Sequence, residues 1–111
     1  MSDIATWLSL AEVGDALDVS PNRVRQLVRD GQLAGIRREG ELRVPADFID
    51  EHGIVKGLPG TIVLLRDAGY ADEELLDWLF RADDTLPGTP IQALRENRGT
   101  EVKRRAQSAG F

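Results

Sequence analysis

The chain has 111 residues, 41% of them hydrophobic and 30% charged, and carries a net charge of −5 at neutral pH. This length allows one domain or two very small ones, with the composition of a folded globular protein. It lacks cysteine, which excludes disulfides and thiolate metal sites. It also lacks an apolar run of the roughly 18 residues that a membrane span needs and the features of a signal peptide, so we expect a cytoplasmic protein with no membrane partner.

The charge is unevenly distributed along the chain. Residues 1–19 carry four acidic side chains and no basic one, a net −4, whereas residues 20–43 carry six arginines and three acidic residues, a net +3. The local field rather than the total charge decides which ligands a surface attracts. The basic segment is therefore either a solvated helix face or a surface that meets phosphates.

The first predicted helix begins in the stretch S-L-A-E, whose first residue is Ser9. Glu12 stands three residues after this serine, and that spacing is typical of a capping box. The helix should stop near Asp18, because aspartate tolerates the left-handed conformation that a tight turn needs.

The second predicted helix covers residues 21–30. Ser20 is expected to cap it, Pro21 to occupy its first position, and Gly31 to end it. Its buried stripe is Val24, Leu27 and Val28. Two short helices joined by about three residues form a helix-turn-helix.

The other side of this second helix is polar and basic. The helical period of about 100° per residue places on it Asn22, Gln26 and Arg29, with Arg23 and Arg25 on its flanks. Asparagine, glutamine and arginine can form paired hydrogen bonds with base edges, and arginine also pairs with phosphates. An ordinary solvated face is the alternative.

Residues 33–44 predict a β-hairpin. In the register that we prefer, Arg38–Gly40 forms a three-residue loop, which puts Ile36 opposite Leu42 and gathers four apolar side chains on one face: Ala34, Ile36, Leu42 and Val44. A two-residue Glu39–Gly40 turn would instead place Ile36 opposite Arg43.

A hairpin that follows a helix-turn-helix is a wing, and wing tips contact the phosphate backbone. In the preferred register Arg37 faces Glu41, which partly neutralises it, while Arg38 and Arg43 are freer. All three arginines are candidate DNA contacts. A short helix beginning at Pro45 should close the unit.

A glycine-rich junction at residues 52–60 divides the chain into a winged helix-turn-helix, residues 1–56, and a helical domain, residues 57–111. Since about 50 residues are few for independent stability, we expect the second unit to pack against the first as a small helical bundle. The fold class is thus mainly α with a small β-hairpin wing.

The predicted helices of the second unit are 61–69, 73–81 after an Asp72 cap, 90–97 stopped by Gly99, and 101–109 after a Thr100 cap.

The stretch WLSLAEVGDALDVSPNRVRQLVRDGQLAGIRREGELRVPADFI resembles the winged helix-turn-helix of the excisionase and MerR-type families. This resemblance implies that helix 21–30 enters the major groove of DNA and that hairpin 33–44 is the wing. Asp18 stands where such turns often have glycine, and its charge should weaken the attraction to phosphates.

The stretches IVKGLPGTIVLLRDAGYADEELLDWLF and VKRRAQSAGF resemble the C-terminal domain of a small actinobacterial family of DNA-binding proteins with the same order of domains. That resemblance implies duplex binding through the N-terminal unit. Some members carry a tail before the first helix, which we expect to be almost absent here. A weaker resemblance links WLFRADDTLPGTPIQAL to the toxin-binding domain of some antitoxins.

We therefore predict a DNA-binding protein that regulates transcription and associates with the nucleoid. Double-stranded DNA would contact eight residues: Asn22, Arg23, Arg25, Gln26, Arg29, Arg37, Arg38 and Arg43. The acidic total predicts weak binding at physiological salt unless a homodimer doubles the contacts. The alternatives are an architectural DNA-binding protein, or an antitoxin-like module that binds a protein partner through its C-terminal helices.

Catalysis is not expected. The chain shows no phosphate loop, nucleophile motif or metal-ligand cluster, and no cofactor is implied. Its single histidine, His52, stands at the expected end of the helix that begins at Pro45, a position that the helix dipole favours by itself. The basic run Lys103–Arg105 is either a solvated helix face or a second nucleic-acid contact.

Overall fold

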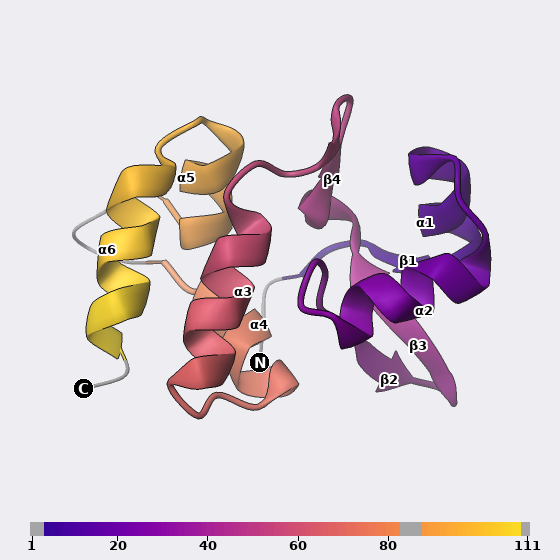
Figure 1. The fold of residues 1–111 in the computed structure, drawn as a ribbon, viewed down its shortest axis with the longest axis horizontal. Coiled ribbons are helices and arrows are strands. Elements are labelled where there is room, and N and C mark those ends of the chain that lie inside the picture. The colour runs from indigo at the N-terminus through magenta and orange to yellow at the C-terminus, as the bar shows by residue number, and fades with distance from the viewer. Residues whose placement is uncertain (1–3, 83–87, 110–111) are drawn as a thin grey trace.

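A computed structural model describes residues 4–82 and 88–109 of the chain. In Figure 1, α1, α2 and a three-stranded sheet lie on one side, α5 and α6 lie on the other, and α3 runs between them. The elements in chain order are β1 (Trp7–Ser9), α1 (Leu10–Leu17), α2 (Pro21–Arg29), β2 (Ile36–Arg38), β3 (Glu41–Pro45), a 3₁₀ turn (Ala46–Phe48), β4 (Ile49–Asp50), β5 (Gly53–Ile54), α3 (Leu58–Asp67), α4 (Asp72–Phe80), α5 (Pro90–Arg95) and α6 (Gly99–Ala109).

The capping box predicted for α1 is confirmed. The Ser9 hydroxyl accepts a hydrogen bond from the Glu12 backbone N–H at 3.1 Å, and the Glu12 carboxylate accepts one from the Ser9 N–H at 2.8 Å. The hydrogen bond from the Ser9 N–H and, second to it, the Ser9 hydroxyl hold the pKa of the Glu12 carboxyl below its ordinary value, with the Arg43 charge contributing less. Asp18 ends the helix in the left-handed conformation, with φ 60° and ψ 46°.

The predicted start of α2 is also confirmed. The Ser20 hydroxyl accepts a hydrogen bond from the Arg23 N–H at 3.1 Å, and Pro21 is the first helical residue. The helix ends at Arg29, and Gly31 follows with φ +82°. The predicted stripe of Val24, Leu27 and Val28 is buried. α1 and α2 therefore form the predicted helix-turn-helix.

The predicted register of the hairpin is wrong. Ile36 lies opposite Arg43 in β3, as in the alternative with a two-residue turn. The turn residues Glu39 and Gly40 both have positive φ, 55° and 82°, and a turn of this kind twists in the same sense as the flanking strands. Gly35 fits this register, because a Cβ there would lie 2.4 Å from the Arg43 carbonyl oxygen.

The sheet has a third strand that the sequence did not predict. Its strand order is β1-β3-β2, and β1 pairs antiparallel with β3 in a register that places Trp7 opposite Pro45 and Leu8 opposite Val44. The segment before α1 therefore fixes the middle strand of the wing on its other edge.

The helix predicted after Pro45 is only a single 3₁₀ turn, Ala46–Phe48. A two-stranded hairpin of β4 and β5 follows. His52 lies in the turn of this hairpin, where its backbone N–H donates to the Asp50 carboxylate at 2.8 Å. The expectation that His52 ends a helix is therefore wrong.

The C-terminal helices form as predicted, with shifted ends. α3 begins at Leu58, directly after Gly57 with φ +86°. Ala71 rather than Asp72 caps α4, and its N–H donates to the Glu74 carboxylate at 2.8 Å. Asp72 instead accepts from Arg66 at 3.1 Å.

The turn between α5 and α6 also differs from the prediction. Asn97, with φ +67°, reverses the chain after α5. Gly99 begins α6 instead of stopping the preceding helix, and Thr100 is its second residue rather than its cap. Most of the segment between the predicted helices 73–81 and 90–97 lies outside the described residues, which omit 83–87.

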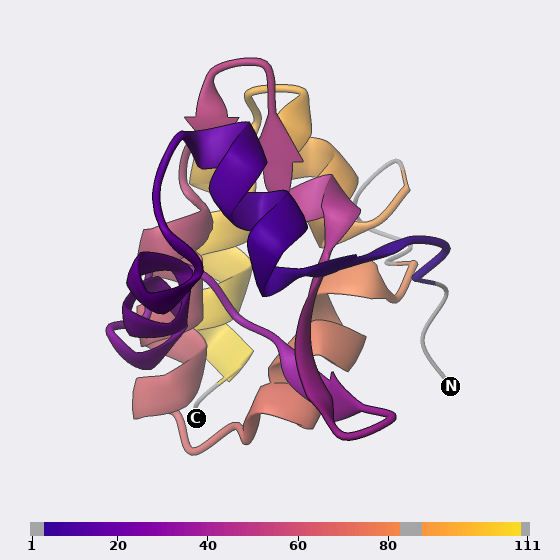
Figure 2. The ribbon, with the colours of Figure 1, turned by 90° about the vertical axis from the view of Figure 1, so that its right-hand side faces the viewer.

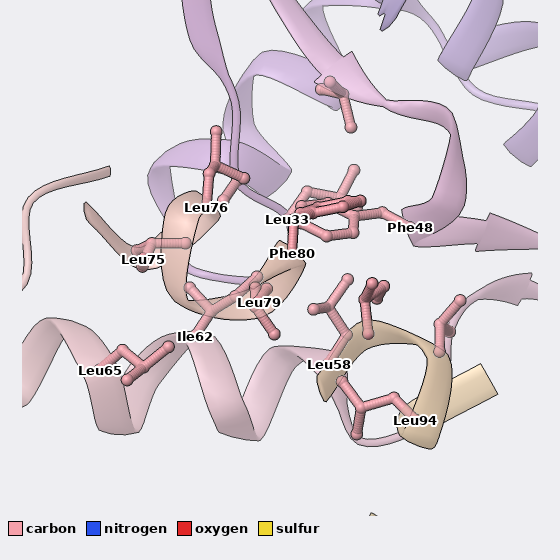
Figure 3. Close-up of a cluster of buried hydrophobic side chains, with 14 of the residues drawn as sticks. Leu33, Phe48, Leu58, Ile62, Leu65, Leu75, Leu76, Leu79, Phe80 and Leu94 are labelled. Carbon is pink, nitrogen blue, oxygen red and sulfur yellow. The ribbon is translucent and has the colours of Figure 1, made fainter. Parts of the chain in front are cut away.

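One hydrophobic core joins the two halves of the chain. Phe48 and Phe80 meet with ring centroids 5.7 Å apart and an angle of 37° between the rings. Figure 3 shows Leu33 beside these rings and leucines of α3 and α4 around them. At the surface, the Arg95 guanidinium donates to the carbonyls of Asp47 and Ile49 at 2.8 and 3.0 Å. The helical bundle is thus packed against the winged unit, as predicted.

None of the helices in residues 4–82 and 88–109 is long and apolar enough to cross a membrane.

Replacing Phe80 by alanine should destabilise the whole molecule. Large-to-small substitutions of buried phenylalanines cost about 3–5 kcal/mol, and Phe80 touches the core of both halves. Urea unfolding followed by circular dichroism and by tryptophan fluorescence should give coincident transitions, shifted to lower urea in the variant. The control Val63→Ala, at a position that is 43% exposed, should shift the transition little. Separate transitions for the two halves would contradict the single core.

The capping box of α1 predicts a pH dependence. Because the pKa of Glu12 is lowered in the folded chain, its contribution to stability is present above the unfolded pKa and is lost as pH falls through the folded pKa. NMR titration should find the Glu12 midpoint below its value in the urea-unfolded chain. Ser9→Ala removes only the hydroxyl and should move that midpoint part of the way upward, because the larger contribution of the backbone N–H remains. An unchanged midpoint would show that the Ser9 hydroxyl does not contribute.

Candidate nucleic-acid interface

The predicted DNA-contacting residues of the second helix share one exposed face of α2. Burial of the opposite stripe fixes how this helix is rotated, so its other side must face outward. The exposed face consists of Asn22, Arg23, Arg25, Gln26 and Arg29. We call this set the α2 face.

Side chains of the α2 face hydrogen-bond to one another. Arg23 donates to the Gln26 side-chain oxygen at 3.3 Å, and Arg25 donates to the Asn22 side-chain oxygen at 3.0 Å. Among residues 4–82 and 88–109, no carboxylate forms an ion pair with Arg23, Arg25 or Arg29. The three positive charges of this face are therefore available to an external anion.

The wing arginines are in three different environments. The guanidinium of Arg38 lies over the ring of Trp7, 4.8 Å from its centroid. Arg37 is exposed opposite Leu42, beside a groove that continues to the acidic first turn of α4, Asp72–Glu74. Arg37 and Arg38 therefore do not form one continuous basic surface at the tip of the wing.

Arg43 differs from the prediction. Its guanidinium pairs with the Glu41 carboxylate at 2.7 Å, and only 27% of its side chain is exposed. It also lies near enough to Glu12 to help lower the pKa of that carboxyl. The expectation that Arg43 is free and Arg37 is neutralised by Glu41 is therefore wrong. The two-residue turn puts Leu42 opposite Arg37, and Glu41 pairs with Arg43 two residues further along the same strand.

α2 and the β2–β3 hairpin belong to the same end of the molecule. Figure 2 looks onto that end, with α1 in the upper middle, α2 at the left and the β2–β3 hairpin at the lower right. A helix with arginine, asparagine and glutamine on its exposed face has the side chains that can read base edges in a major groove. The wing would then supply phosphate contacts beside it.

Sequence reasoning missed Trp7 as part of this surface. Its strand has only three residues, which is too short for an alternating pattern to be recognised. The available signal was an aromatic residue directly before the first capping box.

Other kinds of site have no comparable support. Within residues 4–82 and 88–109, no group of three or more histidine, cysteine or acidic side chains could hold a metal ion.

Two family models match the chain, one after the other. Residues 2–49 match the family model described as the winged helix-turn-helix domain of the DNA-binding protein Rv2175c, and residues 55–110 match that of the Rv2175c C-terminal domain of unknown function. The DNA-binding protein Rv2175c of Mycobacterium tuberculosis (strain H37Rv) is 36% identical over 115 residues, which cover 92% of this chain and 79% of the relative.

Comparison with solved structures points to the same relative. The NMR structure of Rv2175c superposes with a TM-score of 0.89 at 31% sequence identity, covering 100% of this chain and 85% of the other. The names describe DNA binding and not catalysis, in agreement with the prediction of a non-enzymatic protein. The chain therefore belongs to the Rv2175c family, in which a winged helix-turn-helix precedes a C-terminal domain of unknown function.

Proposed function

We propose that this protein binds double-stranded DNA through the α2 face and the wing, and that it regulates transcription from the sites it binds. The observation that carries the proposal is the α2 face itself, where three arginines without carboxylate partners among the described residues stand beside two amide side chains. The printed name of the relative, a DNA-binding protein, supports the same conclusion. Residues 1–56 would contact DNA, and residues 57–111 would support them.

In the proposed complex α2 lies in the major groove. Asn22 and Gln26 can form paired hydrogen bonds with adenine, and an arginine can do so with guanine. These side chains already hydrogen-bond to one another along the helix. A hydrogen bond to a base edge would therefore replace one of these bonds. The net gain from each exchanged hydrogen bond is therefore small, and phosphate contacts should dominate the affinity.

Phosphate contacts make binding strongly dependent on salt, because each neutralised phosphate releases counterions. The candidates are Arg23, Arg25 and Arg29 on α2, with Arg37 and Arg38 on the wing. Arg43 is also a candidate, although it must first give up its ion pair with Glu41. The net charge of −5 opposes this attraction at long range.

Two copies on one duplex would double the contacts and offset this repulsion. We include such a homodimer on DNA in the proposal. The number of protein chains bound per duplex at saturation in a DNA titration tests it. Localisation to the nucleoid would follow from duplex binding. An architectural role in place of transcriptional control would appear as DNA bending without an effect on a promoter.

Replacing Arg25 and Arg29 together by alanine should weaken duplex binding and reduce its salt dependence. Fluorescence anisotropy with random duplex DNA over a salt series measures both. The slope of log affinity against log salt should become less steep by about 1.8, since each lost phosphate contact removes about 0.9. Unfolding by urea should show that both chains are folded.

The double variant Lys103→Ala, Arg104→Ala is the matched control, because it removes the same charge from exposed positions of α6. It should keep the wild-type slope. If the salt slope becomes less steep in the α6 control and stays at the wild-type value in the α2 variant, the basic run of α6 binds DNA instead. If the wild-type chain shows no binding even at low salt, the arginines form a solvated face, and a protein partner for the C-terminal helices becomes the function to test.

A further inference from the structure

The sheet brings Trp7 and Arg38 together on one face although they lie on its two outer strands. Trp7 is opposite Pro45, and Arg38 is opposite Glu41. Positions 41 and 45 of β3 point to the same side because side chains alternate along a strand. The two long side chains therefore meet above the middle strand, where the Arg38 guanidinium lies 4.8 Å from the Trp7 ring centroid.

Stacking on a ring restrains an arginine without neutralising its charge or occupying its hydrogen-bond donors. A guanidinium that lies over an aromatic face keeps its N–H groups directed outward at its edge. An unrestrained arginine loses rotamer freedom when it is fixed. The contact with Trp7 therefore lowers the entropy that Arg38 loses when it binds an anion.

Among the three wing arginines, only Arg38 is both restrained and electrostatically available to DNA. Arg43 lies on the same face but is paired with Glu41. Arg37 lies on the opposite face, beside the groove shared with the acidic first turn of α4. Arg38 forms no ion pair with any residue that the structure describes, and its side chain is only partly buried.

We propose that Trp7 is a positioning residue of the wing, which holds the Arg38 guanidinium ready to contact a backbone phosphate of the duplex. This inference rests on the proposed function. It assigns the phosphate contact of the wing to Arg38 and gives β1 a role in DNA binding besides its pairing with β3. Trp7 acts through Arg38 and does not itself contact DNA.

A double-mutant cycle tests this inference, using wild type, Trp7→Leu, Arg38→Ala and the double variant in the anisotropy assay with random duplex DNA. Arg38→Ala should make the salt slope less steep by about 0.9, the value for one phosphate. Trp7→Leu should weaken binding about two- to fivefold, the equivalent of an exposed cation–π contact, with the slope unchanged because no charge is lost. In the Arg38→Ala background, Trp7→Leu should have no further effect.

Two further variants separate positioning from folding. Trp7→Phe keeps an aromatic face and should retain more affinity than Trp7→Leu. Arg104→Ala removes one charge from α6 and should keep the wild-type slope. In the free protein, the Arg38 side-chain protons should show a ring-current shift in NMR spectra that disappears in Trp7→Leu.

Three results would overturn the inference: additive effects of the two substitutions, an unchanged slope in Arg38→Ala, or no ring-current shift. Each of them leaves the proposed function standing as long as the wild-type chain binds. Absence of binding by the wild-type chain overturns the proposed function and this inference together.

Discussion

The contact between Phe48 and Phe80 joins the two halves of the molecule, and the packing of the helical bundle on the winged unit depends on the core around it. Phe48 follows the wing and Phe80 ends α4, so their contact places the helical bundle beside the winged unit. A unit of some 50 residues has little core of its own, and the shared core supplies what each half lacks. The Arg95 hydrogen bonds to the carbonyls of Asp47 and Ile49 add a polar tie at the same boundary.

The proposed DNA surface is rigid because it is the outer side of this core. The valines and leucine of α2 point inward, so the arginines and amides of the same helix can only point outward. The wing is fixed in a different way, by strands on both edges of β3. An acidic protein can thus present a basic surface without a large basic domain, because a few well-oriented arginines set the local field.

Local signals in the sequence predicted local structure well. Both N-terminal caps of the helix-turn-helix form as expected, since a serine cap and its partners lie within three residues of one another. The hairpin register was wrong because the apolar pattern favoured a three-residue loop, whereas the actual two-residue turn needs a left-handed glutamate that residue preferences disfavour. The α2 face could be predicted from helical periodicity alone, whereas the Trp7–Arg38 stack required both the correct hairpin register and the strand β1.

The shared core also constrains how this family can evolve. Separate family models match residues 2–49 and 55–110, yet Phe48 belongs to one segment and Phe80 to the other. A lineage that acquired a foreign winged helix by recombination would leave Phe80 facing an unsuitable surface. The two segments should therefore be inherited together, and a change of ring size at one of these positions should be followed by a compensating change at the other.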